Sequence, residues 1–236
     1  MDMSISLVIF DISGTTVDDP GAVNRCFRES LAVHGFAVEP EAVDAIMGLP
    51  KPEALRILLG RSLEGDVLLN RIDAIHADFV ARMIAYYAFD PSVREIAGIS
   101  ALFQRLKSAG VKVALNTGFN REIADVVINR LCWFELGLID ASVASDEVSG
   151  GRPLPDMIEH LMVVLNIDDP KRVIKIGDAP ADLEEGLAAG CRWVIGVTWG
   201  THTRSQLMQD AHTHLVDTVE ELTLLLDSAL NPPDVA

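Results

Sequence analysis

Ile5-Ser-Leu-Val-Ile-Phe10, followed by Asp11-Ile-Ser-Gly-Thr-Thr-Val17, is the stretch that decides the fold. Its first six residues form a Val- and Ile-rich apolar run, which is typical of a strand buried in a parallel sheet. Asp11 stands at the carboxyl end of that strand, where open α/β sheets hold their ligands. Backbone N–H groups of the Gly14-Thr15 turn can face an anion while the Asp11 carboxylate is directed at it as a nucleophile. The alternative is that Asp11 only caps the turn that follows it.

The composition predicts a folded protein that stays inside the cell and does not enter a membrane. With 236 residues and 49% hydrophobic content, the chain can bury the core of one large domain, or of a domain with an insertion. No apolar stretch reaches the ~18 residues that span a bilayer, and the N-terminus lacks the features of a secretion signal. Cys26, Cys132 and Cys191 are scattered, as reduced packing residues are. We therefore expect a cytoplasmic protein.

The charge of the chain restricts its partners. A formal net charge of −16 argues against nucleic acid, whose phosphates need a basic surface. A phosphorylated small molecule would in turn need local positive charge from a metal ion, a basic side chain or oriented backbone amides. We expect such groups to be gathered in one place.

Strand and helix patterns alternate along most of the chain. This alternation predicts an α/β fold with a Rossmann-like, doubly wound parallel sheet. After the first strand we expect strands at Val111–Asn116, Ser142–Ser145 and Val173–Ile176, with weaker ones at Trp193–Gly196 and His214–Val216. The helices expected between them are Ser100–Ala109, Arg121–Leu131, Pro155–Leu165 and Ala181–Ala189.

One segment interrupts the alternation. Residues 18–91 are mostly helical in pattern, with expected helices at Ala22–His34, Pro40–Met47, Glu53–Leu59 and Leu68–Tyr87. We interpret 18–91 as a helical cap inserted into a core made of residues 1–17 and 92–236. Caps of this kind close over a site and exclude water.

Four polar signals fall at the ends of candidate core strands or in the loops beyond them. They are Asp11, Thr117-Gly118, Arg152, and Asp178 with Asp182. In this order they resemble the four loop motifs of the haloacid dehalogenase superfamily, over nearly the whole chain. Each motif is weak alone, but the ordered set is specific. The dehalogenases proper work without a metal, so an Asp at position 178 favours phosphoryl chemistry.

The resemblance implies a role for each acidic residue. Asp11 would attack phosphorus and form an aspartyl-phosphate that water hydrolyses. Mg²⁺ would be held by Asp11, the backbone carbonyl of Ser13 and Asp178. Asp182 would ligate the ion through water or orient a ligand; alternatively, it is a negative charge that stabilises the start of its helix.

Thr117 and Gly118 would grip the phosphoryl group with a hydroxyl and a backbone N–H, next to the Gly14-Thr15 turn. Arg152 stands where most of the superfamily has Lys, and it would neutralise the substrate and the nucleophile. The alternative for Arg152 is a solvated loop residue.

Ser13 indicates which branch of the superfamily this chain resembles. Phosphomonoesterases of the superfamily have an acidic Asp two residues after the nucleophile, and a hydroxyl is a poor replacement near neutral pH. Phosphonatases (phosphonoacetaldehyde hydrolases) have Ala at this position and Arg in the third motif. Met47-Gly-Leu-Pro-Lys51 also resembles their Met-Gly-Leu-x-Lys loop, so Lys51 and Gly48 would face the substrate. In those enzymes the Lys forms an imine with an aldehyde; the alternatives are a surface Lys or a simple phosphate contact.

Two positions depart from the phosphonatase pattern. Ala54 stands where phosphonatases have a His, and Phe119 where they have a Tyr. His34 or His76 could approach from the cap, although both fit ordinary helix-face positions. We therefore expect a phosphonatase-like hydrolase of a small phosphonate or phosphate. The alternatives are a phosphomonoesterase of the same superfamily and a non-catalytic binding protein. By analogy with phosphonatases, the cap could also form a homodimer.

Overall fold

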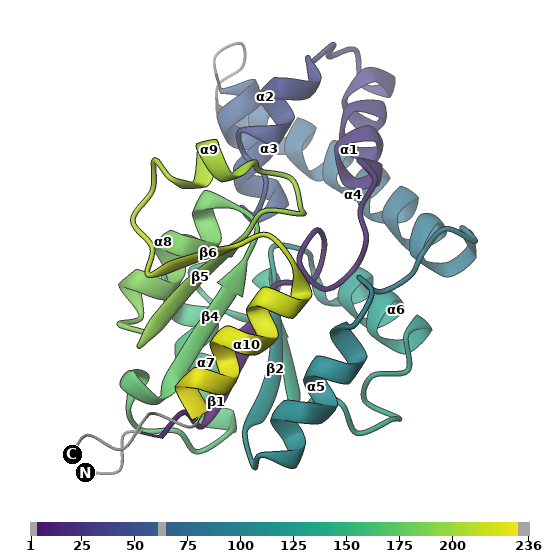
Figure 1. Ribbon diagram of the computed structural model, residues 1–236. Helices are drawn as coiled ribbons and strands as arrows, with labels where there is room; N and C mark the ends of the chain where they lie inside the picture. Colours follow the sequence, from purple (N-terminus) through teal and green to yellow (C-terminus); the bar gives the residue numbers. More distant parts are fainter. Residues whose placement is uncertain (1–3, 61–64, 231–236) are drawn as a thin grey trace, which may run out of the picture.

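Six parallel strands form one sheet in the computed structural model, which describes residues 4–60 and 65–230 (Figure 1). The strand order is β3-β2-β1-β4-β5-β6, and every neighbouring pair is parallel. This is the order of a doubly wound sheet, so the predicted Rossmann-like fold is confirmed. The strands are β1 (Leu7–Phe10), β2 (Lys112–Thr117), β3 (Ala141–Ala144), β4 (Val173–Gly177), β5 (Trp193–Val197) and β6 (His214–Val216).

Helices cover both faces of this sheet. The core helices and 3₁₀ turns are α5 (Ile99–Ser108), α6 (Arg121–Arg130), η1 (Ser145–Glu147), α7 (Asp156–Val164), η2 (Pro170–Arg172), α8 (Pro180–Ala188), α9 (Arg204–Leu207) and α10 (Val219–Leu230). The sequence pattern predicts α5 to α8 to within a few residues. It does not predict α9 or α10, and the C-terminal residues 231–236, expected to be loose, lie outside the described part of the chain.

β1 is buried on both faces, which explains why its sequence is apolar without alternation. Val8 and Phe10 belong to the hydrophobic cluster on the side of α5, α6 and α10. Leu7 and Ile9 belong to a second cluster on the side of α7 and α8. β1 lies between β2 and β4, so the residue that follows β1 reaches the centre of the sheet's carboxyl edge. At this point the strand order changes direction, since β2 and β3 are added on one side of β1 and β4 to β6 on the other.

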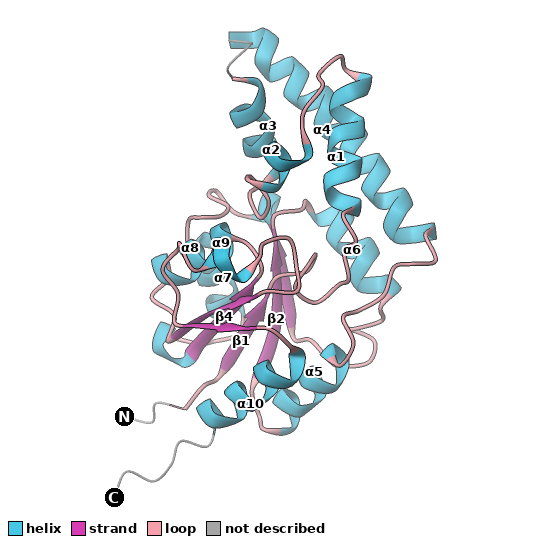
Figure 2. Ribbon diagram, turned by 45° about the horizontal axis from the view of Figure 1, so that its top comes forward, coloured by secondary structure: helices cyan, strands magenta, loops and turns pink. Residues whose placement is uncertain are grey.

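Four helices follow β1 and lie over the carboxyl ends of the strands (Figure 2). They are α1 (Ala22–Val33), α2 (Pro40–Asp44), α3 (Lys51–Leu59) and α4 (Gly65–Phe89). We call residues 18–91 the cap, the division proposed from the sequence. Its two connections to the core run side by side, because Val17 bridges Glu95 and Asp18 Oδ2 lies 2.6 Å from Arg94 Nη2. α4 also packs on α6 of the core, so cap and core share one hydrophobic cluster.

α4 is the longest helix of the cap. Among the described residues, no helix, α4 included, combines the length and the apolar character needed to cross a bilayer.

Candidate active site

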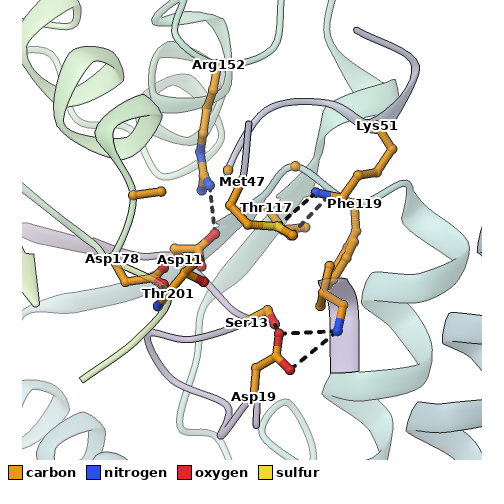
Figure 3. Close-up of a pocket in the computed structure, with 14 residues that line it drawn as sticks. Asp11, Ser13, Asp19, Met47, Lys51, Thr117, Phe119, Arg152, Asp178 and Thr201 are labelled. Carbon is orange, nitrogen blue, oxygen red and sulfur yellow. Dashed lines mark hydrogen bonds and ion pairs between the residues drawn. The ribbon is translucent and has the colours of Figure 1, made fainter. Parts of the chain in front are cut away.

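One pocket between cap and core collects most of the residues singled out in the sequence (Figure 3). The predicted residues that line it are Asp11, Ser13, Gly48, Lys51, Thr117, Gly118, Arg152 and Asp178. They come from the ends of β1, β2 and β4, from the loop before α7 and from the start of α3. The other three, Gly14, Thr15 and Asp182, lie directly behind the wall of the pocket, within contact of Asp178 or of Arg152.

The turn after β1 differs in detail from the expectation. The Gly14 N–H donates to the carbonyl oxygen of Val17 at 2.9 Å, so it is engaged within the turn rather than directed at an anion. The Thr15 hydroxyl donates to Asp178 Oδ1 at 3.2 Å. A methyl group at Gly14, whose φ is +84°, would lie 2.4 Å from Asp178 Oδ2. The turn therefore positions Asp178, and glycine is needed because both the backbone angle and the space exclude a side chain.

Arg152 connects the nucleophile candidate to the core. Its Nη1 donates to Asp11 Oδ1 at 2.7 Å, and its Nε donates to Glu185 Oε2 at 3.0 Å. Nη2 donates to the backbone and side-chain oxygens of Asn116 at 2.9 and 2.7 Å. The side chain is fully buried, so it is not the solvated loop residue of the alternative. Burial opposes its charge, but the nearby carboxylates of Asp182, Asp11 and Glu185 raise the pKa of Arg152 above its usual value.

Beneath Arg152 lies a buried polar network that the sequence analysis did not find. Lys175 of β4 donates to Asp182 Oδ1 at 2.6 Å and to Asn116 Oδ1 at 2.8 Å. Asn116 Nδ2 in turn donates to both Glu185 oxygens, at 2.9 and 2.8 Å. The lysine inside the apolar run Val173-Ile-Lys-Ile176 could have indicated this network. An unpaired charge in a buried strand is too costly to persist, so a buried lysine requires acidic or polar partners. Glu185, three residues after Asp182, lies on the same side of α8.

Asp11, Asp178 and Asp182 form the group of carboxylates that fits a metal ion. Each offers one oxygen, and these oxygens lie within 4.8 Å of one another. Burial, and then repulsion by Asp11 and Asp182, raises the pKa of Asp178 to about 7; burial also raises the pKa of Asp11. A divalent cation bound among these carboxylates would relieve this repulsion. The donor set of buried oxygens therefore fits such an ion.

Asp182 is the least free of the three carboxylates. Its Oδ1 is already bound by Lys175 and lies 3.0 Å from Arg152 Nη1. Its Oδ2 accepts the backbone N–H of Ala179 at 3.3 Å, at the start of α8. These bonds fit the negative charge at the start of α8 that the sequence analysis gave as the alternative, and ligation of the ion through water or orientation of a ligand stays a prediction.

Lys51 is the first residue of α3 and points into the pocket (Figure 3). Its side chain is buried, so it is not a surface lysine. Nζ lies 3.8 Å from Met47 Sδ and within 6.0 Å of the ring centres of Phe27 and Phe119. Burial lowers the pKa of Lys51 to about 8, against the opposing pull of Asp11. Near neutral pH a fraction of this amine is therefore unprotonated and nucleophilic.

Ser13 is held by two residues that the sequence analysis missed. Its Oγ donates to Asp19 Oδ2 at 3.2 Å and accepts from the Tyr87 hydroxyl at 3.3 Å. Asp19 lines the pocket and accepts the backbone N–H of Ala22 at the start of α1. Burial raises the pKa of Asp19 above its usual value. Tyr87 packs edge-on against Phe119, so the same cap residue contacts both Ser13 and the core loop after β2.

Neither histidine considered from the sequence lines this pocket. His76 instead faces a groove between α4 and the start of α6, lined also by Asn120 and Glu122. His34 directly follows α1 as its C-cap residue. Only His76 therefore occupies the helix-face position expected from the sequence.

The cap loop 47–50 rests directly on the backbone of the core. A methyl group at Gly118 would lie 2.7 Å from the carbonyl oxygen of Gly48, and one at Gly151 would lie 2.4 Å from Pro50 Cγ. The pocket enclosed by this contact has a volume of about 30 Å³. A cap that opens to admit a substrate and then closes over it would account for so small a space.

Comparison with known proteins agrees with this geometry. Residues 8–196 match the family of haloacid dehalogenase-like hydrolases. A phosphonoacetaldehyde hydrolase from Bacteroides fragilis is 27% identical over 88% of this chain and 81% of the relative, and one from Bacillus cytotoxicus is 30% identical over 84% and 78%. The crystal structure of a phosphonoacetaldehyde hydrolase-like protein from Oleispira antarctica superposes with a TM-score of 0.82 at 22% identity, covering 96% of this chain and 92% of that one. The chain belongs to the haloacid dehalogenase-like hydrolases, as a phosphonatase-like enzyme that hydrolyses P–C or P–O bonds.

Proposed function

We propose that the protein is an Mg²⁺-dependent phosphonatase that cleaves the C–P bond of a small aldehyde-bearing phosphonate such as phosphonoacetaldehyde. One observation carries the proposal: the Lys51 amine, with a pKa lowered to about 8, faces the same pocket as the Asp11 carboxylate. Imine formation requires a partly neutral amine, whereas a phosphate contact requires only a charged one. The names of the relatives support the same substrate class.

The first step uses Lys51. Its free amine attacks the aldehyde carbon, and the adduct takes up a proton and loses water to give a protonated imine. Phe27, Phe119 and Met47 surround this amine with apolar atoms, which favours the dehydrated product. The imine carbon then sits two bonds from phosphorus and can accept electrons.

The second step uses Asp11. Its carboxylate attacks phosphorus, the C–P bond breaks, and the electron pair of that bond moves into the imine to give an enamine. Arg152, 2.7 Å from Asp11 Oδ1, holds the carboxylate in place and offsets the negative charge that gathers there. Mg²⁺, bound through Asp11, Asp178 and the Ser13 carbonyl, would supply further charge neutralisation when present.

Two hydrolyses complete the cycle. The enamine carbon takes up a proton, and water releases acetaldehyde from Lys51. A second water hydrolyses the aspartyl-phosphate to phosphate and free Asp11. Because one water is released and two are consumed, the net reaction is phosphonoacetaldehyde and one water to acetaldehyde and phosphate. Thr117 and Gly118, in the pocket wall at the carboxyl end of β2, are assigned to the phosphoryl oxygens.

Reductive trapping tests the imine step. With phosphonoacetaldehyde and borohydride, we expect a covalent adduct on the peptide that contains Lys51, detected by mass spectrometry. Lys51→Ala should lose both the adduct and C–P cleavage, whereas Lys107→Ala, a change in a surface ion pair on α5, should keep both. Absence of an adduct, together with full activity of Lys51→Ala, would refute the proposal.

A phosphomonoesterase is the second candidate, because the Asp11, Asp178 and Asp182 carboxylates fit a metal-assisted phosphoryl transfer that does not require Lys51. Ser13 counts against it, because its hydroxyl is bound to Asp19 and Tyr87 and offers no acid for a leaving alcohol. p-Nitrophenyl phosphate, whose leaving group needs no proton, could still react. Steady hydrolysis of many alkyl phosphates with no action on phosphonates would favour this candidate. A non-catalytic protein, the third possibility, would fail to form a beryllium fluoride adduct at Asp11 in the presence of Mg²⁺.

A further inference from the structure

The amine of Lys51 lies between two aromatic rings that come from different parts of the chain. Nζ is 6.0 Å from the ring centre of Phe27, on α1 of the cap, and 5.7 Å from that of Phe119, in the core loop after β2. Both rings are buried, with exposed fractions of 1% and 3%. Phe79 packs against both rings, at 5.3 and 6.4 Å between centres, which holds them in place.

The charges around the amine favour its protonated form. Asp11, Asp19 and Asp178 attract the ammonium, and Arg152 opposes its charge. The faces of the two rings would also attract a cation, but at 5.7–6.0 Å they lie at the limit of that interaction. The pKa of Lys51 nevertheless falls to about 8. Loss of water around the amine therefore outweighs the three carboxylates.

We propose that Phe27 and Phe119 are positioning residues that exclude water from the Lys51 amine, and that this clamp is complete only while the cap rests on the core. Lys51 and Phe27 belong to the cap, whereas Phe119 belongs to the core. Gly118, next to Phe119, is the point where the cap loop meets the core backbone. Docking of that loop thus brings the second ring to the amine.

The purpose of the clamp rests on the proposed function, in which closure of the cap prepares the amine to condense with an aldehyde. With a pKa of about 8, about one amine in ten is free at pH 7. At the usual lysine pKa of about 10.4, the fraction would be only about one in several thousand. An amine that becomes reactive only in the closed site is also spared from condensing with unrelated aldehydes.

Competitive labelling with isotope-tagged acetic anhydride between pH 6 and 11 measures the clamp directly, because only free amines react. Peptide mass spectrometry would compare Lys51 with Lys107, an internal surface reference. We expect a Lys51 midpoint near pH 8 in the native protein. Phe27→Gln and Phe119→Gln should each raise it by about one unit, a tenfold loss of free amine at neutral pH, because a polar side chain admits water. Phe27→Leu and Phe119→Leu, the apolar controls, should leave it within a few tenths of a unit.

Gly118→Ala keeps both rings and provides a second route if a glutamine variant does not fold. Its methyl group should hold the cap loop away from the core and raise the Lys51 midpoint as the glutamine variants do. A native midpoint at pH 10 or above, or midpoints that neither glutamine nor Gly118→Ala shifts, would overturn the clamp. The labelling is independent of substrate: if borohydride trapping fails but these shifts occur, the proposed function is wrong and the clamp stands.

Discussion

Arg152 and Asp11, 141 residues apart in the chain, are joined by a buried contact of 2.7 Å between Nη1 and Oδ1. The same guanidinium reaches Glu185 and Asn116, so one side chain satisfies both the site and the core beneath it. Lys is common here in the superfamily, but a single ammonium cannot make all of these bonds.

Arg152→Lys should therefore separate activity from stability. The ammonium can still approach Asp11, so some turnover should remain, but Glu185 loses a buried partner. We expect the free energy of unfolding to fall by roughly 2–4 kcal/mol in urea titrations. Arg56→Lys, at an exposed ion pair of α3, is the control and should change stability by less than about 0.5 kcal/mol. Equal stability of the two variants would show that the buried bonds contribute little.

Lys51→Met should stabilise the protein at neutral pH while removing the proposed imine chemistry. The folded pKa of about 8 lies below the unfolded value of 10.5, so the unfolded chain binds more protons between these pH values. The native protein therefore gains stability as pH rises from 8 to 10.5, and at pH 7 it carries the full penalty, roughly 3 kcal/mol at most. The advantage of Lys51→Met, measured by denaturant unfolding, should shrink above pH 8 and vanish near pH 10.5. An advantage that is independent of pH would contradict the lowered pKa.

Asp178→Asn should weaken metal binding and, at the same time, stabilise the metal-free protein. The folded pKa of about 7 lies above the usual 3.8, so the native carboxylate costs stability progressively as pH rises from 3.8 to 7. At pH 8 without metal, the Asn variant should melt at a higher temperature than the native protein. Mg²⁺ at 100 times its dissociation constant should then stabilise the native protein by about 2.7 kcal/mol but leave Asp178→Asn unchanged.

Asp66→Asn, an exposed change at the start of α4, serves as the control for that experiment and should keep the full response to Mg²⁺. A response of Asp178→Asn equal to that of the native protein would place the metal elsewhere.

Gly151→Ala should impair closure of the cap without unfolding the core, because the added methyl group meets Pro50 Cγ of the cap loop at 2.4 Å. We expect kcat/KM to fall by roughly tenfold to a hundredfold, as misplacement of a closing element commonly does. Pro50→Ala in the same chain removes the obstructing ring and should restore much of the activity. If the double variant is no better than Gly151→Ala, the contact between the two residues is not the cause.

The sequence was sufficient to predict the sheet and most of the pocket, because both depend on local patterns. Buried parallel strands are apolar runs, and the residue after each run reaches the same edge of the sheet. This places Asp11, Thr117, Arg152 and Asp178 together without knowledge of the structure. That Lys51 faces the pocket could be predicted only from the resemblance of its loop to that of phosphonatases.

What could not be predicted depends on contacts between distant segments. Asp19 and Tyr87 are 68 positions apart, and each meets Ser13 only because the two connections of the cap run side by side. In the sequence, Glu185 is one of several acidic residues of a predicted helix. It is buried against Arg152 and Asn116 because α8 packs on the sheet. The contacts of Gly118 and Gly151 with the cap loop could not be predicted, because no local pattern gives the position of that loop on the core.

Reductive trapping on Asp11→Asn tests the central claim, the division of labour between Asp11 and Lys51, most directly. An amide is a poor nucleophile, so with phosphonoacetaldehyde and Mg²⁺ this variant should form the Lys51 imine but not break the C–P bond. Borohydride should therefore fix an adduct on Lys51 that still contains phosphorus, while phosphate release falls at least about a thousandfold. Phosphate release at the native rate by Asp11→Asn, or an adduct on any residue other than Lys51, would contradict the account.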